Sequence, residues 1–119
     1  MRMRTAVPIV ALLIGLSMAP LAADARDEAK KQVQFGISVA QKSLWREAIF
    51  WWERATKSDP TYAAAHNNLA IAYEHEGDLG KARQAYEKAL ELEPNNAMIK
   101  QNYELFKEIN DRTTRKTGQ

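Results

Sequence analysis

The stretch NNLAIAYEHEGDLGKARQAYEKALELEPNN, residues 67–96, decides the fold of this chain. Its apolar residues recur at intervals of three and four, which is the period of a helix with one buried face. Gly77-Asp78 interrupts the pattern, because glycine suits the left-handed residue after a helix and aspartate suits a helix N-cap. A second break falls at Glu93-Pro94. The pattern therefore predicts two helices, over 63–76 and 79–92.

The same pattern stands 34 residues earlier, so that residues 29–62 align with residues 63–96 as two copies. Large and small residues keep their class at pairs such as Gly36/Ala70 and Trp52/Tyr86. The first copy predicts helices over 29–42 and 45–57, with a turn near Ser43. A repeat of this length indicates stacked helix pairs. Six aligned pairs are identical: Ala29/Ala63, Ile37/Ile71, Ala48/Ala82, Glu53/Glu87, Ala55/Ala89 and Pro60/Pro94.

The second copy resembles the tetratricopeptide repeat, whose pattern places W-x2-L-G-x2-Y before A-x3-F and a final P. This resemblance implies an all-α fold, a short α-solenoid of two antiparallel helix pairs. The small residues of the pattern let the two helices of a pair approach closely. The residues that carry the resemblance are His66, Leu69, Ala70, Tyr73, Ala82, Tyr86 and Pro94 in the second copy, and Phe35, Gly36, Ala48, Trp52 and Pro60 in the first.

Residues 97–111 restart the pattern a third time, but Glu104 stands where Gly36 and Ala70 stand in the two copies. A close-packed partner helix would bury the Glu104 carboxylate at a high free-energy cost. The sequence therefore predicts a C-terminal capping helix over 97–111, which end repeats need for solubility. The polar residues 112–119 predict a disordered tail. The repeat domain is expected to span 26–111.

The first 25 residues are typical of a secretory signal peptide. Two arginines precede a stretch over 6–16 that is apolar apart from Gly and Pro, and small residues follow. Cleavage is expected before Arg26 or before Asp24. An uncleaved membrane anchor is the alternative, but Pro8 and Pro20 interrupt the apolar stretch that a spanning helix needs. The mature protein is therefore expected to be periplasmic or secreted, with no membrane anchor.

The resemblance also implies where a partner binds, since tetratricopeptide proteins usually hold peptides or proteins on the concave face made by the first helix of each pair. Side-chain amides such as those of Asn67 and Asn68 suit an extended peptide backbone. The same positions also fit solvated residues and ordinary helix contacts, and the sequence leaves this alternative open. The expected groove residues are Gln34, Ile37, Gln41, Asn67, Asn68, Ile71, His75, Asn102 and Leu105.

Phe50 and Trp51 are two large aromatic residues that stand where the second copy has Gln84 and Ala85. One interpretation is that residues 27–31 or a neighbouring helix cover them. The other is an interface with a second copy or a partner, because exposed aromatic patches mark such surfaces. Two repeats and one helix are few for a solenoid, so added burial would stabilise the chain.

Composition and motifs argue against catalysis and against nucleic-acid binding. The 119 residues carry a net charge of +2 and no cysteine, which excludes disulfides and thiol chemistry. His66 and His75 are nine positions apart and face opposite ways on one helix, so no metal site is expected. The sequence predicts a non-catalytic protein–protein interaction module without cofactors, an exported adaptor or assembly factor. The alternative is a structural subunit that forms a homodimer through the first repeat.

Overall fold

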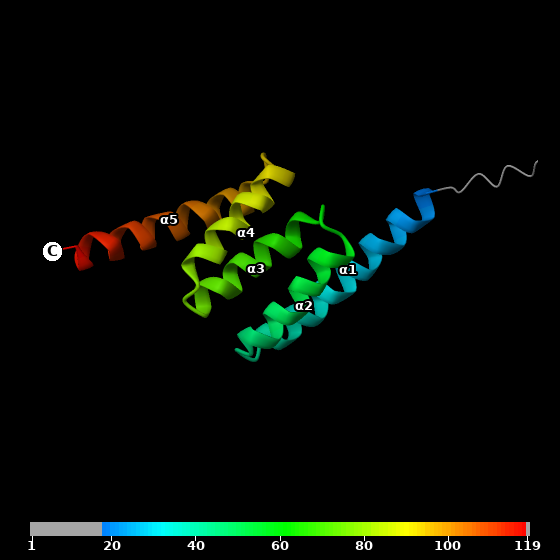
Figure 1. Cartoon of the computed structure of the whole chain (residues 1–119), viewed down its shortest axis with the longest axis horizontal. Helices are drawn as coiled ribbons and strands as arrows, with labels where there is room; N and C mark the ends of the chain where they lie inside the picture. The colour runs from blue at the N-terminus through cyan, green and yellow to red at the C-terminus, as the bar shows by residue number, and fades with distance from the viewer. Residues whose placement is uncertain (1–17, 119) are drawn as a thin grey trace, which may run out of the picture.

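The computed structural model describes residues 18–118, in which every regular element is a helix. The chain runs as two antiparallel helix pairs and a fifth helix that packs on the second pair (Figure 1). This confirms the predicted all-α fold of two helix pairs with a C-terminal helix. The elements are α1 (Met18–Ala40), α2 (Trp45–Ser58), α3 (Ala63–His75), α4 (Leu79–Leu92) and α5 (Ala97–Thr117).

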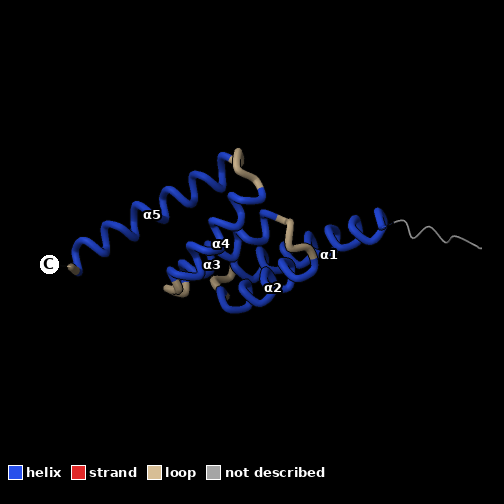
Figure 2. Tube along the Cα trace, turned by 45° about the horizontal axis from the view of Figure 1, so that its top comes forward, coloured by secondary structure: helices blue, strands red, loops and turns tan. Residues whose placement is uncertain are grey.

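Short turns join the helices at the residues that the sequence marks as breaks (Figure 2). Gly77 follows α3 with a φ of 77°, a conformation that glycine adopts without a steric penalty. The side chain of Asp78 then caps α4 by accepting a hydrogen bond from the Lys81 amide. Asn96 caps α5 in the same way through the amides of Met98 and Ile99. The turns therefore fix where each helix begins and ends.

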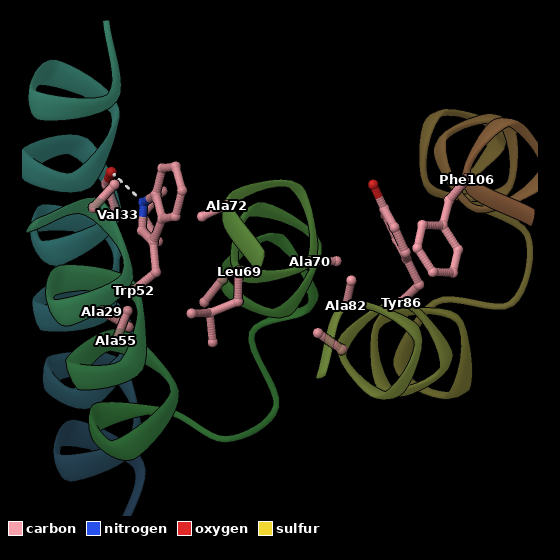
Figure 3. Packing of buried hydrophobic residues seen from close by; sticks show 13 residues of the cluster. Ala29, Val33, Trp52, Ala55, Leu69, Ala70, Ala72, Ala82, Tyr86 and Phe106 are labelled. Atoms are coloured by element: carbon pink, nitrogen blue, oxygen red, sulfur yellow. Dashed lines mark hydrogen bonds between the residues drawn. The ribbon is translucent and has the colours of Figure 1, made fainter. Parts of the chain in front are cut away.

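The core consists of a few large side chains set between alanines (Figure 3). The Trp52 indole is buried and donates a hydrogen bond to the Val33 carbonyl oxygen, 3.0 Å away. Leu69 of α3 points toward this indole, while Ala70 faces Ala82 of α4. The small residues thus allow α3 to pack against α2 on one side and α4 on the other.

Both end helices are longer than the sequence predicts. α1 begins at Met18 rather than at 29, because the alanine-rich residues before Arg26 favour helix. α5 continues to Thr117, so helix replaces the predicted disordered tail over 112–117. An ion pair between Glu108 and Arg112, one turn apart, supports this extension. Basic residues in the last turn also interact favourably with the helix dipole.

Most of the predicted signal peptide, residues 1–25, lies outside the described residues, since the structure describes the chain from residue 18 onward. Among the helices that are described, none has the length and apolar character needed to cross a bilayer.

Candidate functional site

A hollow of about 310 Å³ lies between the two helix pairs, and we call it the groove. Its walls come from α1, from α3 and from α2 between them. No charged side chain is among its lining residues, so it offers apolar surface flanked by side-chain amides. The lining residues are Ile37, Ala40, Gln41, Trp45, Trp52, Asn68 and Ile71.

Four of the predicted site residues meet in the groove: Ile37, Gln41, Asn68 and Ile71. They meet there because equivalent residues of stacked repeats lie side by side along the solenoid. Leu105 of α5 stands 34 residues after Ile71, at the equivalent position of the repeat, and is 55% exposed.

His75 stacks on Trp45 beside the groove. The two rings are 3.8 Å apart between centroids and lie within 5° of parallel. His66 instead contacts the Pro60 carbonyl oxygen at 2.9 Å, on another side of α3. The two histidines therefore serve separate packing contacts. Within residues 18–118, no three His, Cys, Asp or Glu side chains gather as metal ligands would.

Asn67 requires a correction, because it is only 2% exposed. Its side-chain oxygen accepts a hydrogen bond from the Asn102 amide, 3.2 Å away. This hydrogen bond joins α3 to α5, and it leaves Asn67 buried and Asn102 partly exposed. Gln34 is exposed but lines a different hollow, together with Phe35 and Ser38 on α1.

Sequence reasoning missed two residues that line the groove, Trp45 and Trp52. Trp52 is a core residue, and Trp45 is half-buried at the start of α2. Their second role follows from the closeness of α1 to α2, because one edge of a core indole can remain at the floor of an adjoining hollow. The sequence did carry a signal for these two residues. The first copy has tryptophan at the two positions where the second copy has Leu79 and Tyr86.

Phe50 and Trp51 lie on α2, and neither lines the groove. Phe35 of α1 stacks on Trp51 with ring centroids 5.0 Å apart, whereas Phe50 remains 53% exposed. The Arg54 guanidinium lies over both rings, 5.7 Å from the Phe50 centroid and 5.5 Å from that of Trp51. α1 thus covers part of Trp51, whereas the Phe50 ring remains exposed.

Tyrosine–carboxylate hydrogen bonds join α3 to α2 and α4 to α3. The Tyr73 hydroxyl donates to Glu53 of α2 at 2.8 Å, and the Tyr86 hydroxyl donates to Glu74 of α3. Burial, together with the adjacent carboxylate, raises the pKa of Tyr73 and that of Tyr86 well above the usual tyrosine value. Both phenols therefore remain protonated hydrogen-bond donors at neutral pH.

A stack of antiparallel helix pairs with a hollow inner wall defines an α-helical repeat protein. Residues 63–96 match the tetratricopeptide repeat family. The chain therefore carries at least one tetratricopeptide repeat, formed by α3, α4 and the turn that follows. Such repeats are protein–protein interaction modules, and the chain has the helical framework of one.

Curated relatives extend this likeness over most of the chain. The chain is 32% identical over 85 residues to the chloroplastic tetratricopeptide repeat domain-containing protein PYG7 of Arabidopsis thaliana, covering 71% of this chain and 28% of that protein. It is 34% identical over 86 residues to the type IV pilus assembly protein PilF of Pseudomonas aeruginosa, covering 71% and 34%. It is 36% identical over 63 residues to the protein O-mannosyl-transferase TMTC4 of Mus musculus, covering 53% and 8%. The chain thus spans about a third or less of each of these relatives.

Proposed function

We propose that this chain is a non-catalytic adaptor or assembly factor that binds a peptide or protein segment in the groove. The groove residues that we assign to binding are Ile37, Gln41, Asn68 and Ile71, with His75 and Leu105 extending the surface at its margins. One observation carries the proposal: an uncharged apolar hollow lies between the first helices of two stacked pairs. The name of the pilus assembly relative supports an assembly role.

The groove chemistry favours an extended segment with an apolar side chain. An aliphatic or aromatic residue would contact Ile37 and Ile71 and remove their exposed surface from water. The Gln41 and Asn68 amides can each donate and accept, so they can pair with the main chain of such a segment. A strongly charged segment would lose hydration without gaining a partner charge from the groove lining.

An affinity pull-down from envelope extract tests this proposal. Ile71→Asp places a charge in the groove, and Gln84→Asp places the same charge on an exposed position of α4. We expect the wild type and Gln84→Asp to retain the same partner and Ile71→Asp to lose it. Asn68→Ala, which adds no charge, should weaken capture while circular dichroism stays unchanged. Equal capture by all four proteins would contradict binding in the groove.

We also propose that the chain is exported, on the strength of the arginines, the apolar run and the small residues at its N-terminus. N-terminal sequencing of the protein recovered from the envelope fraction tests this. Export predicts a first residue of Asp24 or Arg26. Recovery of the chain in the cytoplasm with residues 1–25 intact would contradict it.

A second candidate function is that of a structural subunit that forms a homodimer, and the exposed Phe50 ring favours it. Sedimentation equilibrium would compare the wild type with a Phe50→Ala/Trp51→Ala variant. A dimeric wild type that becomes monomeric in the variant supports this function. A monomeric wild type at all concentrations contradicts it.

A further inference from the structure

A second hollow, of about 430 Å³, lies along α1, and we call it the α1 seat. It is separate from the groove, because the two hollows have no lining residue in common. Phe35 forms its apolar floor and is 56% exposed, which is unusual for a large aromatic residue at a repeat packing position. The lining residues are Lys30, Lys31, Gln34, Phe35 and Ser38.

The internal repeat shows what kind of element fits this seat. Its residues Lys31, Phe35 and Ser38 stand 34 positions before Ala65, Leu69 and Ala72 of α3. Those three α3 residues are 0%, 6% and 0% exposed. Leu69 and Ala72 point toward Trp52, so this face of α3 seats the helix α2 (Figure 3). On the equivalent face of α1, Phe35 touches only the Trp51 ring of α2 among the aromatic contacts of residues 18–118, and it stays 56% exposed.

The opposite end of the stack is built differently. Glu104 and Lys107 form an exposed ion pair on α5, where a further helix of a third pair would otherwise pack. These charged residues therefore disfavour the packing of another helix on this face of α5. The N-terminal end instead keeps Phe35, stacked on Trp51, at the position where a preceding helix would lie.

Charge identifies the chemistry of the occupant. Lys30 and Lys31 line the α1 seat and no acidic side chain does, while Arg54 lies over the adjoining Trp51 ring. Like charges across an interface oppose association, so these lysines disfavour a basic occupant. An occupant with carboxylates would neutralise them.

We propose that the α1 seat binds an amphipathic helix of a partner protein, with its apolar face on Phe35 and its acidic flank toward Lys30 and Lys31. The partner helix would take the position on α1 that α2 takes on α3. This second surface does not depend on the groove, so the chain would hold two partners, or two parts of one partner, at once.

Two synthetic helical peptides provide the probe. Both carry the same alanine and leucine stripe, and they differ only in glutamate or lysine at the flanking positions. Amide chemical shifts of the full chain would be followed by NMR during titration with each peptide. We expect the acidic peptide to shift the signals of residues 30–38 and to bind at least about tenfold more tightly than the basic peptide.

Variants separate specific binding from general stickiness. Phe35→Ala should lower the affinity for the acidic peptide by about tenfold, because one aromatic contact with the peptide is lost. Lys30→Glu/Lys31→Glu should reverse the preference toward the basic peptide, an effect that damage to the fold would not produce. Gln84→Ala, at an exposed position of α4, should leave the affinity unchanged.

Three results would overturn the proposal. The first is an equal affinity for the two peptides, or no saturable binding of either. The second is that the shifted signals belong to the groove residues rather than to residues 30–38. The third is a wild-type dimer that Phe35→Ala dissociates and that excludes the acidic peptide, because the seat would then belong to a second copy.

Discussion

Gly36 of α1 lies directly against the indole of Trp52, so that a Cβ atom at Gly36 would come within 2.2 Å of Trp52 Nε1. The indole is buried and donates a hydrogen bond to the Val33 carbonyl oxygen, and both hold it in place. The approach of α1 to α2 therefore depends on the absence of a side chain at position 36. The same indole forms part of the groove, so this contact joins stability to the binding site.

Replacement of Gly36 by alanine should destabilise the protein. Alanine favours helix by about 1 kcal/mol over glycine. Overpacking against Trp52 should outweigh this gain and leave a net loss of about 1–3 kcal/mol. Urea denaturation measures the difference. Gly80→Ala is the matched control, because nothing lies within 4 Å of a Cβ there, and it should unfold at the wild-type urea concentration or above. Equal midpoints for the two variants would contradict this packing.

Asp59 should make the fold sensitive to acid. Burial acts to raise the pKa of Asp59, but hydrogen bonds from Thr61 and Arg26 and the charge of Arg26 lower the pKa overall. A lowered pKa means that Asp59 stabilises the fold fully above the ordinary aspartate value of about 3.9. That contribution is lost as the pH falls through the lowered value. Thermal unfolding from pH 6 downward should show Asp59→Asn losing less stability than the wild type. If the wild type and Asp59→Asn lose the same stability as the pH falls, this role of Asp59 is excluded. Glu93→Gln, at an exposed position, serves as the control.

Tyr73 should govern stability at alkaline pH. Its raised pKa means that the folded chain holds the phenol proton more tightly than the unfolded chain. The contribution is therefore complete below the ordinary tyrosine value of about 10 and is lost as the pH rises above it. Tyr73→Phe should cost about 1 kcal/mol at neutral pH, because the hydrogen bond to Glu53 is gone. The stability of the variant should also depend less on pH over about one unit on either side of that value. If Tyr73→Phe and the wild type lose stability equally at alkaline pH, the raised pKa of the Tyr73 phenol is contradicted.

The sequence predicted the three central helices to within about two residues at each end, which is the usual scatter of helix boundaries. It did so because local residues decide these ends, as Gly77 and Asp78 do between α3 and α4. The lengths of α1 and α5 were less predictable, because helix propensity at an exposed end competes only weakly with fraying.

The site was predictable only where repeat register places side chains. Ile37 and Ile71 are equivalent positions of two copies, and the structure brings them to one hollow. Asn67 was predicted to face a ligand, but α5 closes over it, and only long-range packing decides this. The stacking of His75 on Trp45 joins residues from different repeats and has no local sequence signal.

Removal of the His75 ring should expose one face of Trp45. We expect His75→Ala to shift tryptophan emission toward longer wavelength and to weaken partner binding about threefold to tenfold, since one wall contact beside the groove is lost. His66→Ala removes the other imidazole, which contacts Pro60 instead, and should leave both the emission and the affinity unchanged. Identical spectra for His75→Ala and the wild type would contradict the stacked arrangement.

In-cell photocrosslinking tests the central claim most directly, because it reports what lies against the groove in the native setting. A benzophenone amino acid would replace Ile71 in one strain and the exposed Gln84 of α4 in a matched strain. If a partner binds in the groove, position 71 should give a discrete adduct with a different protein, and position 84 should give none. An adduct from position 71 that contains only a second copy of this chain, or adducts from position 84 alone, would contradict it.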